Sequence, residues 1–191
     1  MWCAGLPEDE FRKLPLDVRL HCAMSDLVGW RYGTGAEVRF PKFRPMLPSH
    51  LVDFGEKRID CSSATAYLLA TAFPQGRWSR DRYRELQIMD ASDPWSPVKA
   101  VEAAGVGSRI DKPIPGVWAL SQAWVDDTTS DGDGLSGGHA RIVKFITVDQ
   151  MLVFESTTRD GRIGPRITTS SHADLLRRYT AGVRYAALGE G

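Results

Sequence analysis

Cys61 and His139 are the side chains of this sequence best suited to nucleophilic catalysis. Cys61 follows Asp60 and opens a run of small and apolar residues, 61–73, that predicts a buried helix ending before Pro74. The N-terminus of a helix exposes unpaired N–H groups and a partial positive charge, which favour a thiolate over a thiol. We therefore expect Cys61 to be a reactive and partly exposed thiolate.

His139 follows the small residues Ser136-Gly-Gly138 at the start of a predicted strand, 140–146. An imidazole within hydrogen-bond distance of a thiolate would stabilise it as an ion pair and then protonate the leaving amine as a general acid. Cys61 and His139 are far apart in the sequence, so only the fold can bring them together. Their pairing would give the chemistry of a thiol peptidase.

Glu155 is the candidate for a third group that orients the imidazole. It lies sixteen residues after His139, on the next predicted strand, 151–156. If the connecting loop is Thr147-Val148-Asp149, Glu155 faces Arg141 and lies diagonal to His139 on the same sheet face, at about 7–8 Å. A two-residue loop would put the two side chains on opposite faces. The alternative is that Glu155 is a strand residue that faces solvent and has no catalytic role.

The order of the predicted elements indicates an α+β fold. An amphipathic helix is expected over 16–28, and Ser96, Pro97 and Gly105 have the residue types that begin and end a second helix. The later part of the chain predicts an antiparallel meander, then a short helix that Ser171 and Asp174 would cap. The strands are expected over 117–122, 140–146, 151–156, 164–168 and 183–186. We expect one domain over 1–191, with its core at about 16–186.

Composition excludes several classes of protein. The chain has 191 residues, of which 42% are hydrophobic and 25% charged, as in ordinary globular domains. Lys plus Arg and Asp plus Glu both total 24, so no net positive field draws the protein to nucleic acid. No apolar run approaches the roughly 20 residues that span a bilayer. Charges within the first twenty residues interrupt any signal-peptide core, so we expect no export signal.

The other cysteines and histidines are expected to have no catalytic role. Three cysteines form neither a CxxC pair nor an even disulfide set, which argues against a thiolate zinc site and a disulfide-stapled scaffold. The acidic segment 126–138 lacks the glutamate that an EF-hand places at its twelfth position, so we expect no calcium site there. This segment and residues 39–48 would border the cleft. The residues expected to be structural, solvated or incidental are Cys3, Cys22, His21, His50 and His172.

At these residues the sequence resembles the NlpC-type cell-wall cysteine peptidases, which have a reduced papain-like fold. Five segments resemble family motifs in the family's order, and the resemblance runs from about Leu16 to Ala186. Leu27–Gly35 resembles the family's first helix end with its Tyr-x-Gly-Gly-like turn, and Ile59–Ala64 resembles its Asp-Cys-Ser-Gly nucleophile motif. Pro113–Leu120 resembles the Pro-Gly-Asp strand and Gly138–Val143 the Gly-His-Val strand. Val153–Thr157 takes the place of the strand with the third polar residue.

The resemblance implies N-terminal helices packed on an antiparallel sheet, and hydrolysis of peptide or isopeptide bonds in peptidoglycan stem peptides without a metal or organic cofactor. By matching position, Cys61 would be the nucleophile, His139 the base and acid, and Glu155 the orienting residue. The Cys61 N–H and the Tyr32 hydroxyl would stabilise the oxyanion. Asp60 and Ser62 would bind the substrate's amine or polar backbone. Tyr32 is alternatively a packed aromatic residue and Asp60 a simple helix cap.

Three positions depart from the family pattern. Ser63 replaces the motif's glycine, Val117 replaces an acidic residue, and Glu155 stands where the family most often has histidine. A glutamate in the third place is found in the related CHAP amidases. The order Cys before His argues against the circularly permuted acyltransferase relatives.

Two functions follow from this reading. The first is a cysteine endopeptidase or amidase whose partner is the cell wall, delivered by phage lysis or tail machinery or by a dedicated secretion system. The second is a catalytically silent papain-like binding or assembly module. A reactive thiolate would be alkylated at Cys61 far faster than at Cys3 or Cys22.

Overall fold

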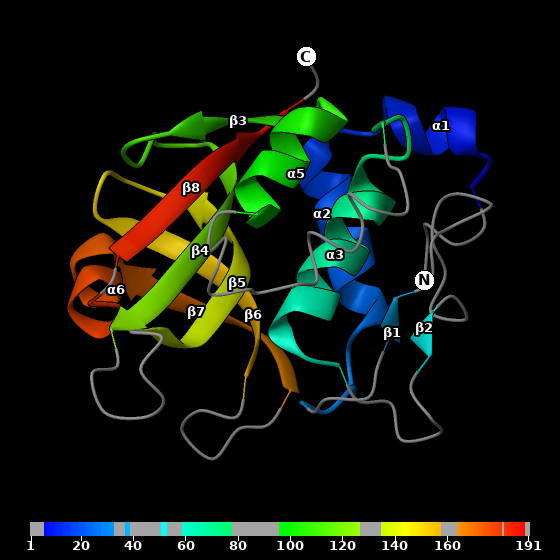
Figure 1. Ribbon diagram of the computed structural model, residues 1–191. Helices are drawn as coiled ribbons and strands as arrows, with labels where there is room; N and C mark the ends of the chain where they lie inside the picture. Colours follow the sequence, from blue (N-terminus) through cyan, green and yellow to red (C-terminus); the bar gives the residue numbers. More distant parts are fainter. Residues whose placement is uncertain are drawn as a thin grey trace.

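The chain folds as a mixed α+β protein around a six-stranded antiparallel sheet (Figure 1). The computed structural model describes residues 6–32, 37–38, 51–52, 59–77, 96–126, 135–157, 164–180 and 182–189. The helices are α1 (Glu8–Lys13), α2 (Leu16–Asp26), α3 (Cys61–Ala72), α5 (Ser96–Ala104) and α6 (His172–Arg178). The strands of the sheet are β3 (Gly107–Ile110), β4 (Trp118–Asp126), β5 (Leu135–Phe145), β6 (Gln150–Thr157), β7 (Gly164–Ser171) and β8 (Gly182–Leu188). A separate two-stranded pair joins β1 (Glu37–Val38) to β2 (Leu51–Val52).

The predicted meander is confirmed over four strands. The strand order is β3-β8-β4-β5-β6-β7, so β4 to β7 are neighbours in chain order. The last strand returns beside β4, and β3 forms the edge beyond it. The sequence did not indicate β3, β1, β2 or α1, which are short elements with weak periodicity. Cys3, His50, residues 39–48 and most of the acidic segment 126–138 lie outside the described residues.

The two faces of the sheet carry different helices. On one face, α2, α3 and α5 pack against Leu120, Ile142 and Phe154. On the other face, α6 with Tyr179 packs against a smaller cluster that includes Val143 and Val153. Figure 1 shows α6 separated by the sheet from the other helices. Side chains at alternate positions of β5 therefore face different helices.

The central helix α3 is buried along its whole length, as its composition predicts. All twelve residues from Cys61 to Ala72 are buried, because small side chains let the backbone approach both α2 and the sheet. Phe73 forms the C-cap, one residue earlier than expected. The predicted second helix is α5, and Gly105 follows it with φ of 70°.

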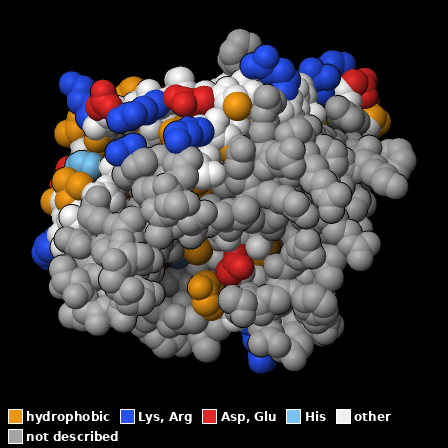
Figure 2. All heavy atoms as spheres, viewed as in Figure 1, with side chains coloured by type: hydrophobic (Ala, Val, Ile, Leu, Met, Phe, Trp, Pro, Cys, Tyr) orange, Lys and Arg blue, Asp and Glu red, His pale blue; other side chains and the backbone are white. Residues whose placement is uncertain are grey.

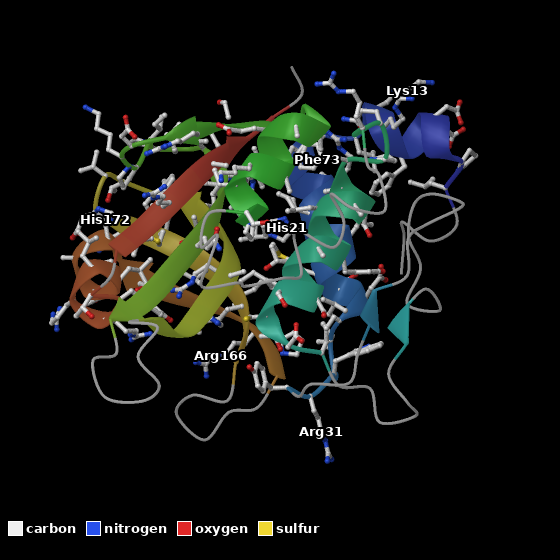
Figure 3. The ribbon with its side chains drawn as sticks, viewed as in Figure 1. Lys13, His21, Arg31, Phe73, Arg166 and His172 are labelled. Atoms are coloured by element: carbon white, nitrogen blue, oxygen red, sulfur yellow. The ribbon has the colours of Figure 1, made fainter. Side chains whose placement is uncertain are left out.

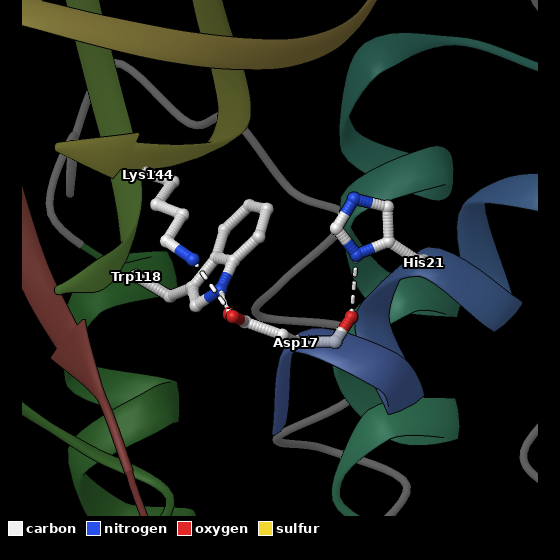
Figure 4. A network of polar contacts seen from close by, with 4 residues as sticks. All are labelled: Asp17, His21, Trp118 and Lys144. Carbon is white, nitrogen blue, oxygen red and sulfur yellow. Dashed lines mark hydrogen bonds and ion pairs between the residues drawn. The ribbon is translucent and has the colours of Figure 1, made fainter. Parts of the chain in front are cut away.

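A polar network ties the first turn of α2 to the sheet (Figure 4). The Asp17 carboxylate accepts hydrogen bonds from the indole N–H of Trp118 and from Nζ of Lys144, the latter at 2.8 Å. His21 Nδ1 lies 2.6 Å from the backbone oxygen of Asp17. These contacts lower the pKa of Asp17, chiefly through the hydrogen bond with Lys144. They fix α2, and through it α3, against β4 and β5.

The edge of the sheet at β3 carries charged side chains of both signs. Arg109 on β3 lies 3.8 Å from the carboxylate of Asp111, just after the strand. In Figure 2 basic and acidic side chains lie together in the upper part of the view. Charged edge strands discourage pairing with a second chain. Within the described residues, no helix is both long and apolar enough to cross a bilayer.

Candidate active site

The site is built where β5 and β6 part. Their ladder runs from Phe145 opposite Met151 to Ile142 opposite Phe154 and stops there, although both strands continue. The same register places Ala140 opposite Ser156. At this level Ser156 Oγ donates a hydrogen bond of 2.7 Å to the carbonyl oxygen of Ile59. The residues leading into α3 therefore lie against the open end of these two strands.

A second segment fixes the start of α3 from the other side. The N–H of Ile59 donates to the carbonyl oxygen of Arg31 at 2.8 Å, while the Arg31 side chain points away from the molecule (Figure 3). Gly164, at the start of β7, has φ of 120°, and a Cβ built there would lie 2.3 Å from the carbonyl oxygen of Trp30. Only glycine lets residues 30 and 31 approach this closely. Tyr32 is thereby brought next to Cys61.

Asp60 is the N-cap of α3. Its Oδ1 accepts the backbone N–H of Ser63 at 2.7 Å and the hydroxyl of Ser62 at 3.0 Å. The capping alternative considered for Asp60 is therefore realised. Ser62 and Asp60 bond to each other, and their contact with a substrate stays a prediction.

Cys61 is more buried than its position at a helix start suggested. Its residue is 7% exposed, and the backbone of Ala140 and of Ser62 hydrogen-bonds its sulfur. Burial is the largest influence and raises the pKa of the thiol, and the charge of Asp60 adds to this effect. The two hydrogen bonds and the charge of Arg141 act in the opposite direction but do not prevail. The expectation of an exposed resting thiolate is therefore wrong, because loss of hydration outweighs the helix terminus.

His139 and Glu155 are brought together. Nε2 of His139 lies 2.9 Å from Oε2 of Glu155, and both side chains are largely buried. The prediction required a three-residue loop between β5 and β6. Ile146 N donates to Gln150 O at 2.8 Å, so the loop is residues 147–149, as predicted. The resulting register puts Glu155 opposite Arg141 and diagonal to His139 on one face.

Glu155 is held as a carboxylate. Burial opposes ionisation, but the hydrogen bond and charge of His139 and the charges of Arg141 and Arg166 lower its pKa to about 2. Arg166 Nη2 lies 3.6 Å from Oε1 of Glu155, directly across from it on β7. Figure 3 shows Arg166 at the end of the sheet where α3 begins. The carboxylate is thus ionised at any pH near neutrality.

Tyr179 and Arg141 complete the surroundings of the imidazole. The Tyr179 ring stacks on that of His139, with centroids 6.4 Å apart and planes 6° from parallel. The Arg141 guanidinium carbon lies 4.6 Å from the centre of the same Tyr179 ring. Sequence reasoning placed Arg141 opposite Glu155 but gave it no role, and it missed Arg166 and Tyr179. Strand alternation could have identified both arginines, whereas no sequence pattern points to Tyr179.

The Cys61 sulfur and His139 both lie where β5 has no ladder with β6, the sulfur at the backbone of Ala140 and His139 one residue before it. Phe145 N donates to Val117 O, so the N–H groups of odd-numbered β5 residues point toward β4. The N–H of Ala140, an even-numbered residue, therefore points toward β6, where it hydrogen-bonds the Cys61 sulfur. The imidazole of His139 bonds Glu155 on β6 and stacks on Tyr179, on the α6 side of the sheet. Its Nε2 is engaged there, and Nδ1 is the nitrogen on the other side of the ring.

Tyr32 is half-buried beside Cys61. Burial is the main cause that raises the pKa of its phenol, and the neighbouring ionisable groups of Cys61 and Asp60 raise it further. The hydroxyl therefore keeps its proton near neutral pH and can act as a hydrogen-bond donor. Its predicted oxyanion role stays a prediction.

The other sulfur and imidazole groups have structural environments. Cys22 is disulfide-bonded, which corrects the expectation that no disulfide forms, and its partner is outside the described residues. Cys61 is the free thiol of the described part of the chain. His172 Nδ1 lies 2.9 Å from the hydroxyl of Tyr185, and His21 belongs to the Asp17 network. Among the described residues, no three His, Cys, Asp or Glu side chains group to hold a metal ion.

Neither the models of known protein families nor the curated proteins give a match to this chain. The candidate site therefore stands on its own geometry.

Proposed function

We propose that the protein is a cysteine endopeptidase or amidase with a reduced papain-like fold that hydrolyses peptide or isopeptide bonds in peptidoglycan stem peptides. The observation that carries this proposal is the buried hydrogen bond between His139 Nε2 and Glu155 Oε2, formed beside the strand residue whose N–H bonds the Cys61 sulfur. On this proposal the thiol, the imidazole and the orienting carboxylate act together, as nucleophilic acyl transfer needs.

The chemistry begins with a neutral thiol. As the sulfur of Cys61 attacks the carbonyl carbon, its proton moves to Nδ1 of His139, and Glu155 stabilises the imidazolium. The Cys61 N–H and the Tyr32 hydroxyl would donate to the oxyanion. The C–N bond breaks as His139 returns its proton to the leaving amine. Water, deprotonated by His139, then attacks the thioester and releases the acid and the thiol.

Burial of Cys61 gives a reason for this order of events. A raised pKa means that the enzyme at rest carries no thiolate, so proton transfer has to accompany the attack. A third member with a pKa of about 2 remains ionised throughout and fixes the imidazole without exchanging protons itself. The substrate's carbonyl would enter at the exposed side of Tyr32.

A second candidate function is a catalytically silent binding or assembly module of the same fold. The burial of Cys61 and the raised pKa of its thiol favour it, since both reduce nucleophilicity in the free protein. It predicts binding to wall fragments without any change in their mass.

Digestion of defined wall fragments separates the two functions. Purified muropeptides of known cross-linking are incubated with the full chain and weighed by mass spectrometry. The proposal expects fragments whose summed mass exceeds the substrate by one water, and none with the Cys61→Ala variant. Intact substrate after incubation with the parent, or equal cleavage by Cys61→Ala, contradicts it. Because Cys61 is buried, the stability of Cys61→Ala is measured by urea denaturation as well. We expect its free energy of unfolding to fall by about 1–2 kcal/mol.

A further inference from the structure

A pocket rich in arginine opens on the α6 side of the sheet, next to the His139–Glu155 pair. Its volume is about 220 Å³, and it lies between β5, β6, β7 and α6. We call it the arginine pocket; the polar and charged residues that line it and enter the argument are Arg141, Glu155, Arg166, Thr168 and Arg178. A volume of this size holds about seven waters, or a small polyatomic ion with part of its hydration shell.

Arg141 is the member that most needs a ligand. It is 1% exposed, and its Nε and Nη2 have no hydrogen-bond partner within the described structure. Its guanidinium lies over the Tyr179 ring, which satisfies the face of the group but not its N–H edge. Burying guanidinium N–H groups without an acceptor is unfavourable, so a ligand that accepts hydrogen bonds would offset this cost.

The charge balance of the pocket selects an anion. Arg141, Arg166 and Arg178 face one carboxylate, Glu155, which is already bonded to His139. The pocket therefore keeps an excess of positive charge. A guanidinium donates two parallel N–H bonds, a geometry that matches two oxygens on one centre, as in phosphate or carboxylate. The hydroxyl of Thr168 adds a further donor.

We propose that the arginine pocket binds a small oxyanion with two or more oxygens on one centre, and that Arg141 and Arg178 are its principal ligands. Two sources offer this chemistry, namely free inorganic phosphate and the terminal carboxylate of a peptide. The inference concerns binding alone, and it holds whether or not Cys61 performs catalysis. Both side chains line the pocket, and Arg178 on α6 is exposed while Arg141 on β5 is buried.

Titration calorimetry on the full chain at low ionic strength tests the proposal. The probes are inorganic phosphate, acetyl-alanyl-alanine, and the C-terminal amide of that dipeptide. We expect Arg178→Ala to weaken binding at least about tenfold, the loss of one charge-assisted contact. Arg177→Ala is the matched control, since Arg177 neighbours Arg178 on α6, is exposed and pairs with Asp174 outside the pocket. This control should bind within about twofold of the parent.

The probes identify the source and can overturn the proposal. Phosphate binding that Arg178→Ala weakens and Arg177→Ala does not supports a free oxyanion. Binding of the dipeptide acid but not of its amide supports a peptide carboxylate. Absence of heat with both anions at concentrations on the order of 10 mM overturns the proposal, and so does an equal loss in the two arginine variants, which would indicate unspecific attraction. Arg141→Lys, if folded by circular dichroism, should also weaken binding, and unchanged affinity would exclude Arg141 as a ligand.

Discussion

Nε2 of His139 and Oε2 of Glu155 lie 2.9 Å apart although they are on different strands, at diagonal positions across the β5–β6 pair. Tyr179 stacks on the imidazole and Arg166 approaches the other carboxylate oxygen. The ring is therefore held from its edge and its face. An imidazole restrained in this way can exchange protons repeatedly at one nitrogen without reorienting.

Replacing Glu155 by glutamine should reduce kcat on wall fragments about a hundredfold while KM changes little. The amide keeps the size of the side chain but removes the charge that stabilises the imidazolium. Steady-state kinetics on a purified muropeptide measures both constants. Glu102→Gln on α5 is the control, because Glu102 is exposed and remote from the sheet opening. Parent-like kcat in Glu155→Gln would remove Glu155 from the catalytic group.

Stability should fall in acid because of the same carboxylate. The folded pKa of Glu155, about 2, lies below its ordinary value of 4.5. Its contribution is therefore fully present above pH 4.5 and is lost as the pH falls toward 2, an effect on the order of 3 kcal/mol. Urea denaturation at a series of pH values measures it. Glu155→Gln should show a shallower decline over this window, and an identical decline in the two proteins would contradict the assignment.

The hydroxyl of Ser156 should position the nucleophile. Ser156→Ala breaks the buried bond to the Ile59 carbonyl, so we expect a loss of about 1–2 kcal/mol in urea denaturation and about tenfold slower cleavage. Ser121→Ala is a matched control, because the buried hydroxyl of Ser121 has no partner in the described structure. It should leave stability unchanged or slightly increased. Equal effects of the two substitutions would show that the Ser156 bond anchors nothing.

The sequence predicted the strand pairing well because pairing follows local rules. Alternation along 140–146 and 151–156, together with a loop over 147–149, placed His139 and Glu155 on one face, and the structure has that register. The buried helix from Cys61 and its Asp60 cap follow from composition and capping preference in the same way.

The state of Cys61 could not be predicted in this way. Whether a thiol at a helix start is ionised depends on how far water is excluded, and residues distant in the sequence determine this. The helix terminus and the nearby backbone N–H groups favour the thiolate, but burial dominates. The contacts of Arg166 and Tyr179 could not be predicted for a related reason. They arise from the packing of β7 and α6 around the His139–Glu155 pair rather than from a local sequence pattern.

Alkylation of Cys61 should be slow at neutral pH. A pKa above that of an ordinary thiol leaves little thiolate at pH 7, and the thiolate fraction grows as the pH rises toward that value. Iodoacetamide labelling of the native protein, followed by peptide mapping, should be slower at Cys61 than for free glutathione at pH 7 and should accelerate above pH 9. Fast labelling that is independent of pH between 6 and 9 would show a resting thiolate.

Trapping of a covalent intermediate tests the central claim most directly. Muropeptide is mixed with an excess of the full chain, the reaction is quenched in acid within a single turnover, and peptides containing Cys61 are weighed. We predict that the Cys61 peptide gains the mass of the acid product less one water, as a thioester requires. This adduct should disappear as the free acid forms. Cleavage at the parent rate by Cys61→Ala, or a parent that cleaves with no adduct on Cys61 at any quench time, would contradict the account.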